Sequence, residues 1–314
     1  MKSVSIVMPM FNESESIHTS LARIEKAIEG LPYQFECVAV NDGSRDDTLQ
    51  KLQQYQPVEL RLRIVDLSRN FGKEAALTAG MEYARGDAVI PMDADLQDPP
   101  ELISALIAEW EKGFEVVLAK RQDRQSDSLV KRTTARWFYR FINRLSEIKI
   151  PEDVGDFRLM DRVVVDVIKQ LPENHRFMKG LFAWAGFRTT SIDYVRPRRE
   201  QGETKFNGWR LWNLALEGIT SFSTVPLRIW TYMGFLVTTV AFLYGAYIIF
   251  DTLFHGSAVP GYPSLLSVIL FLSGIQIAGM GILGEYLGRA YLETKRRPVF
   301  IARSVSEILP AEKS

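Results

Sequence analysis

The segment Ala88–Pro100, AVIPMDADLQDPP, decides how this chain is interpreted. Its first residues, Ala88–Met92, form a short apolar run in which valine and isoleucine favour a β-strand, and the turn-forming pair Pro99–Pro100 bounds it downstream. Asp93 and Asp95 follow the run directly. Side chains two residues apart on a strand project to the same side, so both carboxylates would face one point. Such a pair suits Mg²⁺ or Mn²⁺, but a polar strand end with solvated aspartates has the same sequence, so the pair alone does not decide between them.

Apolar runs alternate with amphipathic segments around this strand. We expect strands at Ser3–Met8, Phe35–Val40, Leu60–Leu67, Ala88–Met92 and Glu115–Lys120. We expect helices at Glu15–Glu29, Asp46–Tyr55, Gly72–Ala84 and Glu101–Lys112. Because alternating strands and helices are joined by right-handed crossovers, the pattern predicts an α/β fold with a Rossmann-like, mostly parallel sheet.

Polar turns follow four of the expected strands, at Pro9–Glu13, Asn41–Asp42, Ser68–Lys73 and Asp93–Gln97. In parallel α/β sheets, ligands bind in the crevice beyond the carboxyl ends of the strands. Four polar turns that converge on one crevice therefore predict a nucleotide site. The chain lacks the glycine-rich fingerprint of dinucleotide enzymes after its first strand and also lacks the P-loop, which disfavours both of those classes.

The composition limits the range of partners. The 314 residues contain 38 Lys+Arg and 38 Asp+Glu, so the overall charge gives no sign of a nucleic-acid partner. The single cysteine, Cys37, cannot form an internal disulfide. The apolar stretch Val4–Met10 is too short for a secretory signal, and we expect the N-terminal part to be cytoplasmic.

Two segments combine cations with other features, and each has two interpretations. Ser128–Lys149 carries basic residues at helical spacing and aromatic residues on another face, which fits either a packed helix with a solvated basic face or an element at anionic lipid headgroups. Arg196–Phe206 places Arg198, Arg199 and Lys205 around a glycine. Cations on such a loop suit phosphate binding, although alone they are more often solvated surface.

The last third of the chain has the character of a membrane protein. Gly208–Ser223 places Trp209 and Trp212 on one helical face, which suits a membrane interface. Thr231–Phe250 and Leu265–Gly284 are uncharged and long enough to cross a bilayer, so we expect two transmembrane helices.

The cations flanking these spans predict their orientation. Lysines and arginines precede the first span and follow the second, whereas the loop between the spans has none. The positive-inside rule then places both termini in the cytoplasm. Gly284 and Gly288 form a G-x-x-x-G pair, which allows close helix contact either within the chain or between the chains of a homo-oligomer.

These features divide the chain into four expected parts. Residues 1–206 form a cytoplasmic α/β domain, 207–228 a juxtamembrane amphipathic helix, 229–290 a two-helix transmembrane region and 291–314 a cytoplasmic tail. A multi-pass membrane protein, with its N-terminal domain in the cytoplasm, is the expected arrangement.

The motifs together resemble the polyprenyl-phosphate glycosyltransferases of glycosyltransferase family 2. The resemblance is carried by VSIVMPMFNE at Val4–Glu13, VNDGS at Val40–Ser44, RNFGKE at Arg69–Glu74, DADLQDPP at Asp93–Pro100, GDFR at Gly155–Arg158 and GETKF at Gly202–Phe206. The segment NGWRLWNLALEGITSFS at Asn207–Ser223 is most similar to the bactoprenol glucosyltransferases of O-antigen glucosylation.

The resemblance implies a GT-A fold that uses a UDP-sugar, Mg²⁺ or Mn²⁺, and undecaprenyl phosphate in a lipid membrane. It assigns nucleotide-sugar binding to Pro9, Asn12, Glu13, Asp42, Lys73 and Asp93, and metal binding to Asp93, Asp95 and Gln97. It assigns catalytic roles to Asp156, Arg199 and Lys205. One departure is Thr204, where many members have serine, and the hydroxyl is retained.

The implied reaction is inverting transfer of glucose from UDP-glucose to undecaprenyl phosphate. An acceptor phosphate with a second pKa of about 6 is mostly ionised near neutral pH. For this reason we expect Asp156 to position the acceptor or the sugar hydroxyls rather than to remove a proton.

Rival interpretations remain open at the level of sequence. The same reaction with mannose, galactose, N-acetylglucosamine or an aminoarabinose derivative fits equally well, because one sequence does not reveal the shape of the sugar pocket. A non-catalytic membrane scaffold or a flippase component is the alternative from another class. A processive polysaccharide synthase is disfavoured, since Thr133 stands where its Q-x-x-R-W motif has glutamine.

Overall fold

The computed structural model describes residues 1–95, 97–121, 154–171, 173, 176, 178–194, 225–255 and 261–310. Its strands are β1 (Ser3–Met10), β2 (Gln34–Asn41), β3 (Arg61–Leu67), β4 (Ala88–Pro91), β5 (Val116–Arg121), β6 (Val154–Asp161), β7 (Thr189–Tyr194) and β8 (Ala302–Ile308). Its helices are α1 (Ile17–Ile28), α2 (Thr48–Gln54), α3 (Lys73–Tyr83), the 3₁₀ turn η1 (Pro100–Leu102), α4 (Ile103–Glu111), α6 (Arg162–Gln170), α7 (Met178–Trp184), α9 (Val225–His255) and α10 (Tyr262–Thr294).

The strands form one sheet in the order β7-β5-β6-β4-β1-β2-β3-β8. The pairs β4–β1, β1–β2, β2–β3 and β5–β7 are parallel, whereas β6 runs antiparallel to β4 and β5, and β8 runs antiparallel to β3. The α/β fold with a mostly parallel sheet is thereby confirmed, and each strand and helix expected between residues 3 and 120 is present within a few residues of its expected bounds.

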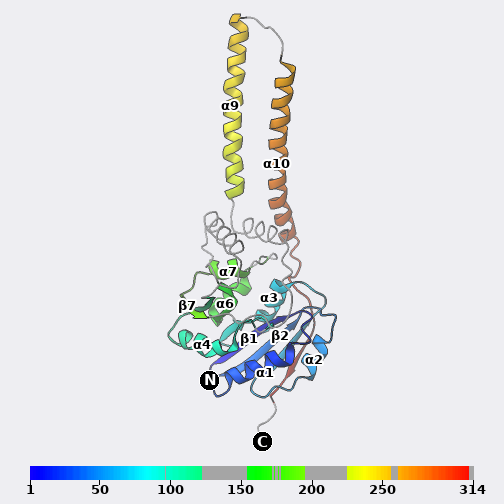
Figure 1. Ribbon diagram of the computed structural model, residues 1–314, viewed down its shortest axis with the longest axis vertical. Coiled ribbons are helices and arrows are strands. Elements are labelled where there is room, and N and C mark those ends of the chain that lie inside the picture. Colours follow the sequence, from blue (N-terminus) through cyan, green and yellow to red (C-terminus); the bar gives the residue numbers. More distant parts are fainter. Residues whose placement is uncertain are drawn as a thin grey trace.

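Two apolar layers cover the two faces of the sheet. Helices α1, α2 and α4 pack on one face, and helices α3, α6 and α7 pack on the other (Figure 1). Strand β1 serves both layers, since Ile6 and Met8 belong to the first and Val7 to the second. Residues buried on both faces give the nearly continuous apolar run that is typical of a central parallel strand.

The antiparallel strand β6 brings a distant segment to the ligand-binding edge. Its pairing with β4 joins Ala88 to Asp161 and Val89 to Met160. Because the two strands run in opposite directions, the amino end of β6 lies beside the carboxyl end of β4. Continuing this register places Asp156 opposite Asp93.

Helices α9 and α10 extend away from the catalytic domain as a long hairpin (Figure 1). Within the part of the chain that the structure describes, one segment is long and apolar enough to span a membrane, Ile229–Tyr247 of α9, with a mean hydropathy of 1.4. The second expected span, Leu265–Gly284, is helical within α10 but stays a prediction as a membrane span. The basic segment Ser128–Lys149 and most of the expected juxtamembrane helix lie outside the described residues.

The C-terminal segment returns to the catalytic domain. Strand β8 pairs with β3, from Ala302 beside Leu67 to Ile308 beside Leu62, and forms one edge of the sheet. The expected C-terminal tail therefore contains a strand of the catalytic sheet that was not predicted from the sequence.

Candidate active site

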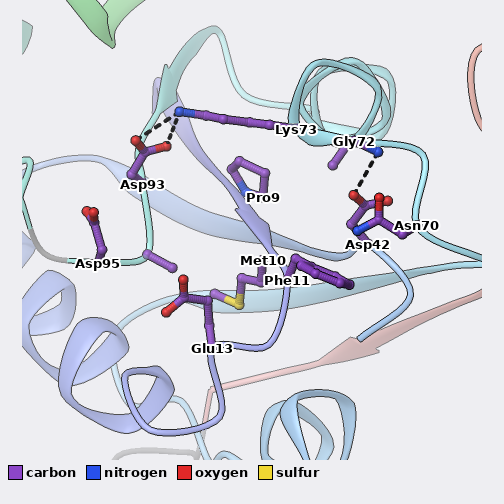
Figure 2. A pocket seen from close by; sticks show the side chains of 12 residues that line it. Pro9, Met10, Phe11, Glu13, Asp42, Asn70, Gly72, Lys73, Asp93 and Asp95 are labelled. Atoms are coloured by element: carbon purple, nitrogen blue, oxygen red, sulfur yellow. Dashed lines mark hydrogen bonds and ion pairs between the residues drawn. The ribbon is translucent and has the colours of Figure 1, made fainter. Parts of the chain in front are cut away.

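A cavity of about 290 Å³ opens beyond the carboxyl ends of the central parallel strands (Figure 2). It is lined by Pro9, Met10, Phe11, Glu13, Asp42, Asn70, Gly72, Lys73, Ala76, Asp93, Ala94 and Asp95. These residues come from the ends of β1, β2 and β4, from the loop after β3 and from the start of α3. The polar turns predicted to converge on one crevice do so.

Lys73 joins two acidic residues at this edge of the sheet. Its Nζ lies 2.6 Å from Asp93 Oδ1 and 2.8 Å from Asp156 Oδ2. Although burial favours the neutral amine, the carboxylates of Asp93 and Asp156 raise the pKa of Lys73 above its usual value. Lys73 is thus a fixed positive charge between an acidic residue after β4 and another on β6.

Hydrogen bonds within the turn after β4 hold Asp93 and Asp95 in position. The Asp93 backbone N–H donates to Asp98 Oδ2 at 3.3 Å, and the Gln97 backbone N–H donates to Asp95 Oδ1 at 3.2 Å. Asp98 is buried, so its carboxylate is part of the scaffold rather than the cavity surface. Both Asp93 and Asp95 line the cavity (Figure 2).

The donor set fits a divalent metal that shares its coordination with a substrate. Among the described residues, no three acidic, histidine or cysteine side chains are grouped as a metal cage. Mg²⁺ is commonly held by one or two carboxylates, with substrate phosphates and waters completing the octahedron. Asp93 and Asp95 supply such a pair beside an open cavity.

Asp42 holds the loop that forms the opposite wall. Its carboxylate is 3% exposed and accepts hydrogen bonds from the backbone N–H groups of Phe71, at 2.7 Å, and Gly72, at 2.9 Å. Gly72 has φ +97° and ψ 159°, a conformation that residues with a Cβ rarely adopt. Asp42 and Gly72 together set the position of the residues that follow, beginning with Lys73.

The turn after β1 is fixed by side chains rather than by a regular backbone pattern. Asn12 has a left-handed φ of 56° and its Oδ1 accepts from the Arg45 backbone N–H at 2.9 Å. The Glu13 backbone N–H donates to Thr48 Oγ1 at 3.0 Å. Asn12 therefore ties the β1 turn to the β2 turn, and the Glu13 side chain lines the cavity.

Comparison with known proteins identifies the family. Residues 5–168 match the family described as Glycosyl transferase family 2, and residues 225–290 match the family described as GtrB C-terminal hairpin. The chain belongs to glycosyltransferase family 2. The resemblance seen in the sequence motifs is confirmed, and the protein is a glycosyltransferase enzyme, not a non-catalytic scaffold.

Curated relatives match this glycosyltransferase along nearly its whole length. The "Prophage bactoprenol glucosyl transferase homolog" of Escherichia coli K12 is 53% identical and the match covers 97% of this chain and 99% of that protein. The "Bactoprenol glucosyl transferase" of Shigella phage SfV is 53% identical, with 96% of this chain and 98% of that protein covered. An "Uncharacterized glycosyltransferase" of Synechocystis sp. PCC 6803 is 51% identical, with 99% and 98% covered.

The structure brings together most of the residues predicted for the site of this glycosyltransferase. Pro9, Glu13, Asp42, Lys73, Asp93 and Asp95 line the cavity. Asp156 is joined to the cavity through Lys73. Among the described residues, Asn12 and Gln97 are not part of the cavity lining, and their contacts are with neighbouring turns. Arg199 and Lys205 lie outside the described residues.

Arg158 is a site-forming residue that sequence reasoning missed. It is 5% exposed, and its Nη2 donates to the Gly155 carbonyl oxygen at 2.8 Å while its guanidinium stacks 4.2 Å from the Phe182 ring centroid. Burial lowers the pKa of Arg158 to about 10, an effect that the nearby carboxylates of Asp156 and Glu74 partly oppose. Arg158 thus supports the strand end that presents Asp156. Arg158 belongs to the GDFR motif, but nothing in the sequence distinguishes this buried arginine from an arginine on the surface.

Proposed function

We propose that the protein transfers glucose from UDP-glucose to undecaprenyl phosphate, with inversion at the anomeric carbon, at the cytoplasmic face of the bacterial inner membrane. The observation that carries the proposal is the cluster of Lys73, Asp93 and Asp156 at the mouth of a cavity beyond the parallel strands. The match of residues 225–290 to the GtrB C-terminal hairpin, and the bactoprenol glucosyl transferase names of close relatives, support the lipid acceptor and the sugar.

Different residues of the cavity have different roles in binding the donor. Asp93 and Asp95 are the side chains that would hold a divalent metal. Such an ion supplies positive charge to the departing diphosphate. Lys73 lies 2.6 Å from Asp93 and adds a second cation at the same place, so it can stabilise the negative charge that develops on the leaving group.

In this proposal Asp156 orients the acceptor or the sugar. Its carboxylate is paired with Lys73 at 2.8 Å, and its backbone carbonyl oxygen accepts from Arg158 Nε at 3.4 Å. A polyprenyl phosphate is mostly ionised at neutral pH, its second pKa being about 6, and needs no strong base to become a nucleophile. Asp156 therefore acts by position, holding the attacking group on the face of the sugar opposite to the diphosphate.

The helical hairpin explains why such an enzyme carries membrane helices. A polyprenyl chain cannot leave the bilayer, so the cavity has to be held at the level of the headgroups. The apolar segment Ile229–Tyr247 supplies one anchor, and α10 runs beside α9 as the second arm of the hairpin (Figure 1). Both termini are then on the cytoplasmic side, with the catalytic domain.

Transfer by full-length variants in proteoliposomes tests this proposal. Asp93→Asn and Asp95→Asn should each lower the formation of lipid-linked glucose from UDP-glucose and undecaprenyl phosphate on the order of 100-fold, because each removes an anionic ligand of the divalent metal that would neutralise the departing diphosphate. The matched control is Asp87→Asn. Asp87 lies at the opposite end of the same strand and accepts from Ser3. Transfer retained in both cavity variants, with the same membrane insertion as Asp87→Asn, would contradict the proposed site.

A further inference from the structure

The C-terminal strand β8 lies against the loop that forms one wall of the donor cavity. Because β8 runs antiparallel to β3, its first residue, Ala302, stands beside Leu67, the last residue of β3. The chain reaches this position after passing through the whole α9–α10 hairpin (Figure 1). The residues that follow β3, including Asn70 and Gly72, line the cavity.

Residues of the C-terminal segment bind both backbone groups of Ser68, the first residue after β3. The Ser68 N–H donates to the Ile301 carbonyl oxygen at 2.9 Å, and the Ser68 carbonyl oxygen accepts from Arg303 Nη2, also at 2.9 Å. Arg303 Nη1 also lies 3.7 Å from Asp66 Oδ2. One guanidinium therefore reaches both the end of β3 and the start of the cavity loop.

Asp66 connects Arg303 to the turns after β2 and β1, which border the cavity. Its side chain is 5% exposed, and its Oδ1 accepts from Asn41 Nδ2 at 2.7 Å. Asn41 Oδ1 in turn accepts from the Ser44 N–H at 3.2 Å, and Ser44 Oγ accepts from the Asn12 N–H at 3.0 Å. A line of hydrogen bonds thus runs from the C-terminal strand to the turns after β2 and β1.

Arg303 supplies a positive charge next to the buried carboxylate of Asp66. A buried carboxylate is costly to hold unless it is paired and hydrogen-bonded. Asn41 contributes a neutral donor to Asp66, and Arg303 contributes a cation at the rim. Loss of Arg303 would leave Asp66 with less compensation and would release the Ser68 carbonyl, so the start of the cavity loop would be held less firmly.

We propose that the strand following the membrane hairpin is part of the donor site, with Arg303 as a positioning residue that acts through Asp66 and Ser68 on the nucleotide cavity. The proposal deepens the proposed function and rests on it. It means that donor binding depends on correct return of the chain from the membrane, because the residue that fixes the cavity wall comes after both hairpin helices.

The alternative is that β8 does no more than close the edge of the sheet. Arg61 offers a matched control for this alternative, since it joins the same two strands through a 3.2 Å ion pair with Glu307. Arg61 lies at the amino end of β3, away from the cavity, and Arg303 at the carboxyl end. Both side chains are half-exposed or more, so both replacements leave the core intact.

Steady-state kinetics of the full-length protein in proteoliposomes, together with equilibrium binding of UDP, tests the role of Arg303. Arg303→Ala should raise KM for UDP-glucose and the Kd of UDP about 5-fold to 20-fold, as expected for loss of one charge-assisted contact, with kcat at saturating donor changed less than about 2-fold. Arg303→Lys should give an intermediate KM, because its single ammonium cannot bind Asp66 and Ser68 together. Arg61→Ala should leave KM and Kd within about 2-fold of the wild type.

Equal effects of Arg303→Ala and Arg61→Ala on KM and Kd would overturn the positioning role, as would a fall in kcat with KM unchanged. A wild-type protein that binds UDP but transfers no sugar to the lipid would overturn the proposed function, while the Kd comparison would still decide the role of Arg303. The two failures are therefore distinguishable.

Discussion

Replacing Gly72 by alanine should weaken UDP binding while leaving the fold intact. Gly72 has φ +97° and ψ 159°, and its N–H donates to Asp42 Oδ2 at 2.9 Å. A Cβ added at this position would meet no atom within 4 Å, so alanine fits the available space. The perturbation is therefore one of backbone conformation alone, in the loop that leads into Lys73.

The backbone strain sets the size of the expected effect. Holding a residue with a Cβ in this region of φ/ψ space costs about 1–3 kcal/mol. The loop can escape the strain only by giving up the hydrogen bond from the Gly72 N–H to Asp42, and such a bond to a charged group contributes about 1.5–3 kcal/mol. Either route disfavours the binding-competent loop by a similar amount. Since about 1.4 kcal/mol is a factor of ten, the Kd of UDP should rise about 5-fold to 150-fold.

Gly113→Ala is the matched control for this variant. Gly113 has φ +90°, and a Cβ there would also meet no atom within 4 Å. It lies between α4 and β5, at the amino end of that strand and thus at the edge of the sheet opposite to the cavity. Its replacement should cost stability of the same order and leave UDP binding unchanged.

Titration calorimetry of UDP with Mn²⁺ on the purified full-length protein, paired with thermal unfolding, separates the two variants. We expect both to lower the unfolding temperature and only Gly72→Ala to weaken binding. If Gly72→Ala bound UDP as tightly as Gly113→Ala, the loop held by Asp42 would not be part of the nucleotide site.

Two further predictions concern stability. Arg63→Met should lower the free energy of unfolding of the catalytic domain by about 3–5 kcal/mol, as measured by denaturant unfolding. The reason is that it removes the buried Arg63 partner of Glu36 on β2, and the Arg63 side chain is only 3% exposed. A loss below about 1 kcal/mol would contradict this prediction. Gly279→Ala should lower the thermal stability of the hairpin in detergent, because the new Cβ would lie 2.0 Å from the Trp230 ring. Gly281→Ala is the control, since a Cβ at Gly281 would meet no atom within 4 Å, and it should leave the stability unchanged. Equal stability of the two variants would show that α9 and α10 do not pack at this position.

The catalytic sheet was largely predictable because its signals are local. Strands β1 and β2 are short apolar runs that end in polar turns, and the helix between them, α1, ends just before the helix-breaking residues Gly30 and Pro32. Four turns at the ends of parallel strands must meet at one edge, so the position of the cavity followed from the alternation of elements.

The strand β8 was not predictable in this way. Its sequence, ARSVSEI, is mostly polar, and most of its side chains are exposed in the structure. It is a strand because β3 offers an unpaired edge to which it can hydrogen-bond, and that edge lies more than two hundred residues earlier in the chain. A local pattern carries no information about such a partner.

The pairing of Lys73 with Asp156 was also beyond the sequence. Both residues were predicted for the site through resemblance, but their contact depends on β6 entering the sheet antiparallel beside β4. The structural contact of Asn12 was also beyond the sequence. Its assignment to the nucleotide stays a prediction, and its Oδ1 accepts from the Arg45 N–H, a contact made at a position with a left-handed backbone.

The most direct test of the central claim is mass spectrometry of the lipid product. The full-length protein would be given undecaprenyl phosphate and an equimolar mixture of UDP-glucose, UDP-galactose and UDP-N-acetylglucosamine, each with a different isotopic label. The account predicts a single dominant product, undecaprenyl phosphate carrying the glucose label, and its loss in Asp93→Asn. A product that carries another label, or the glucose product formed equally well by Asp93→Asn, would contradict it.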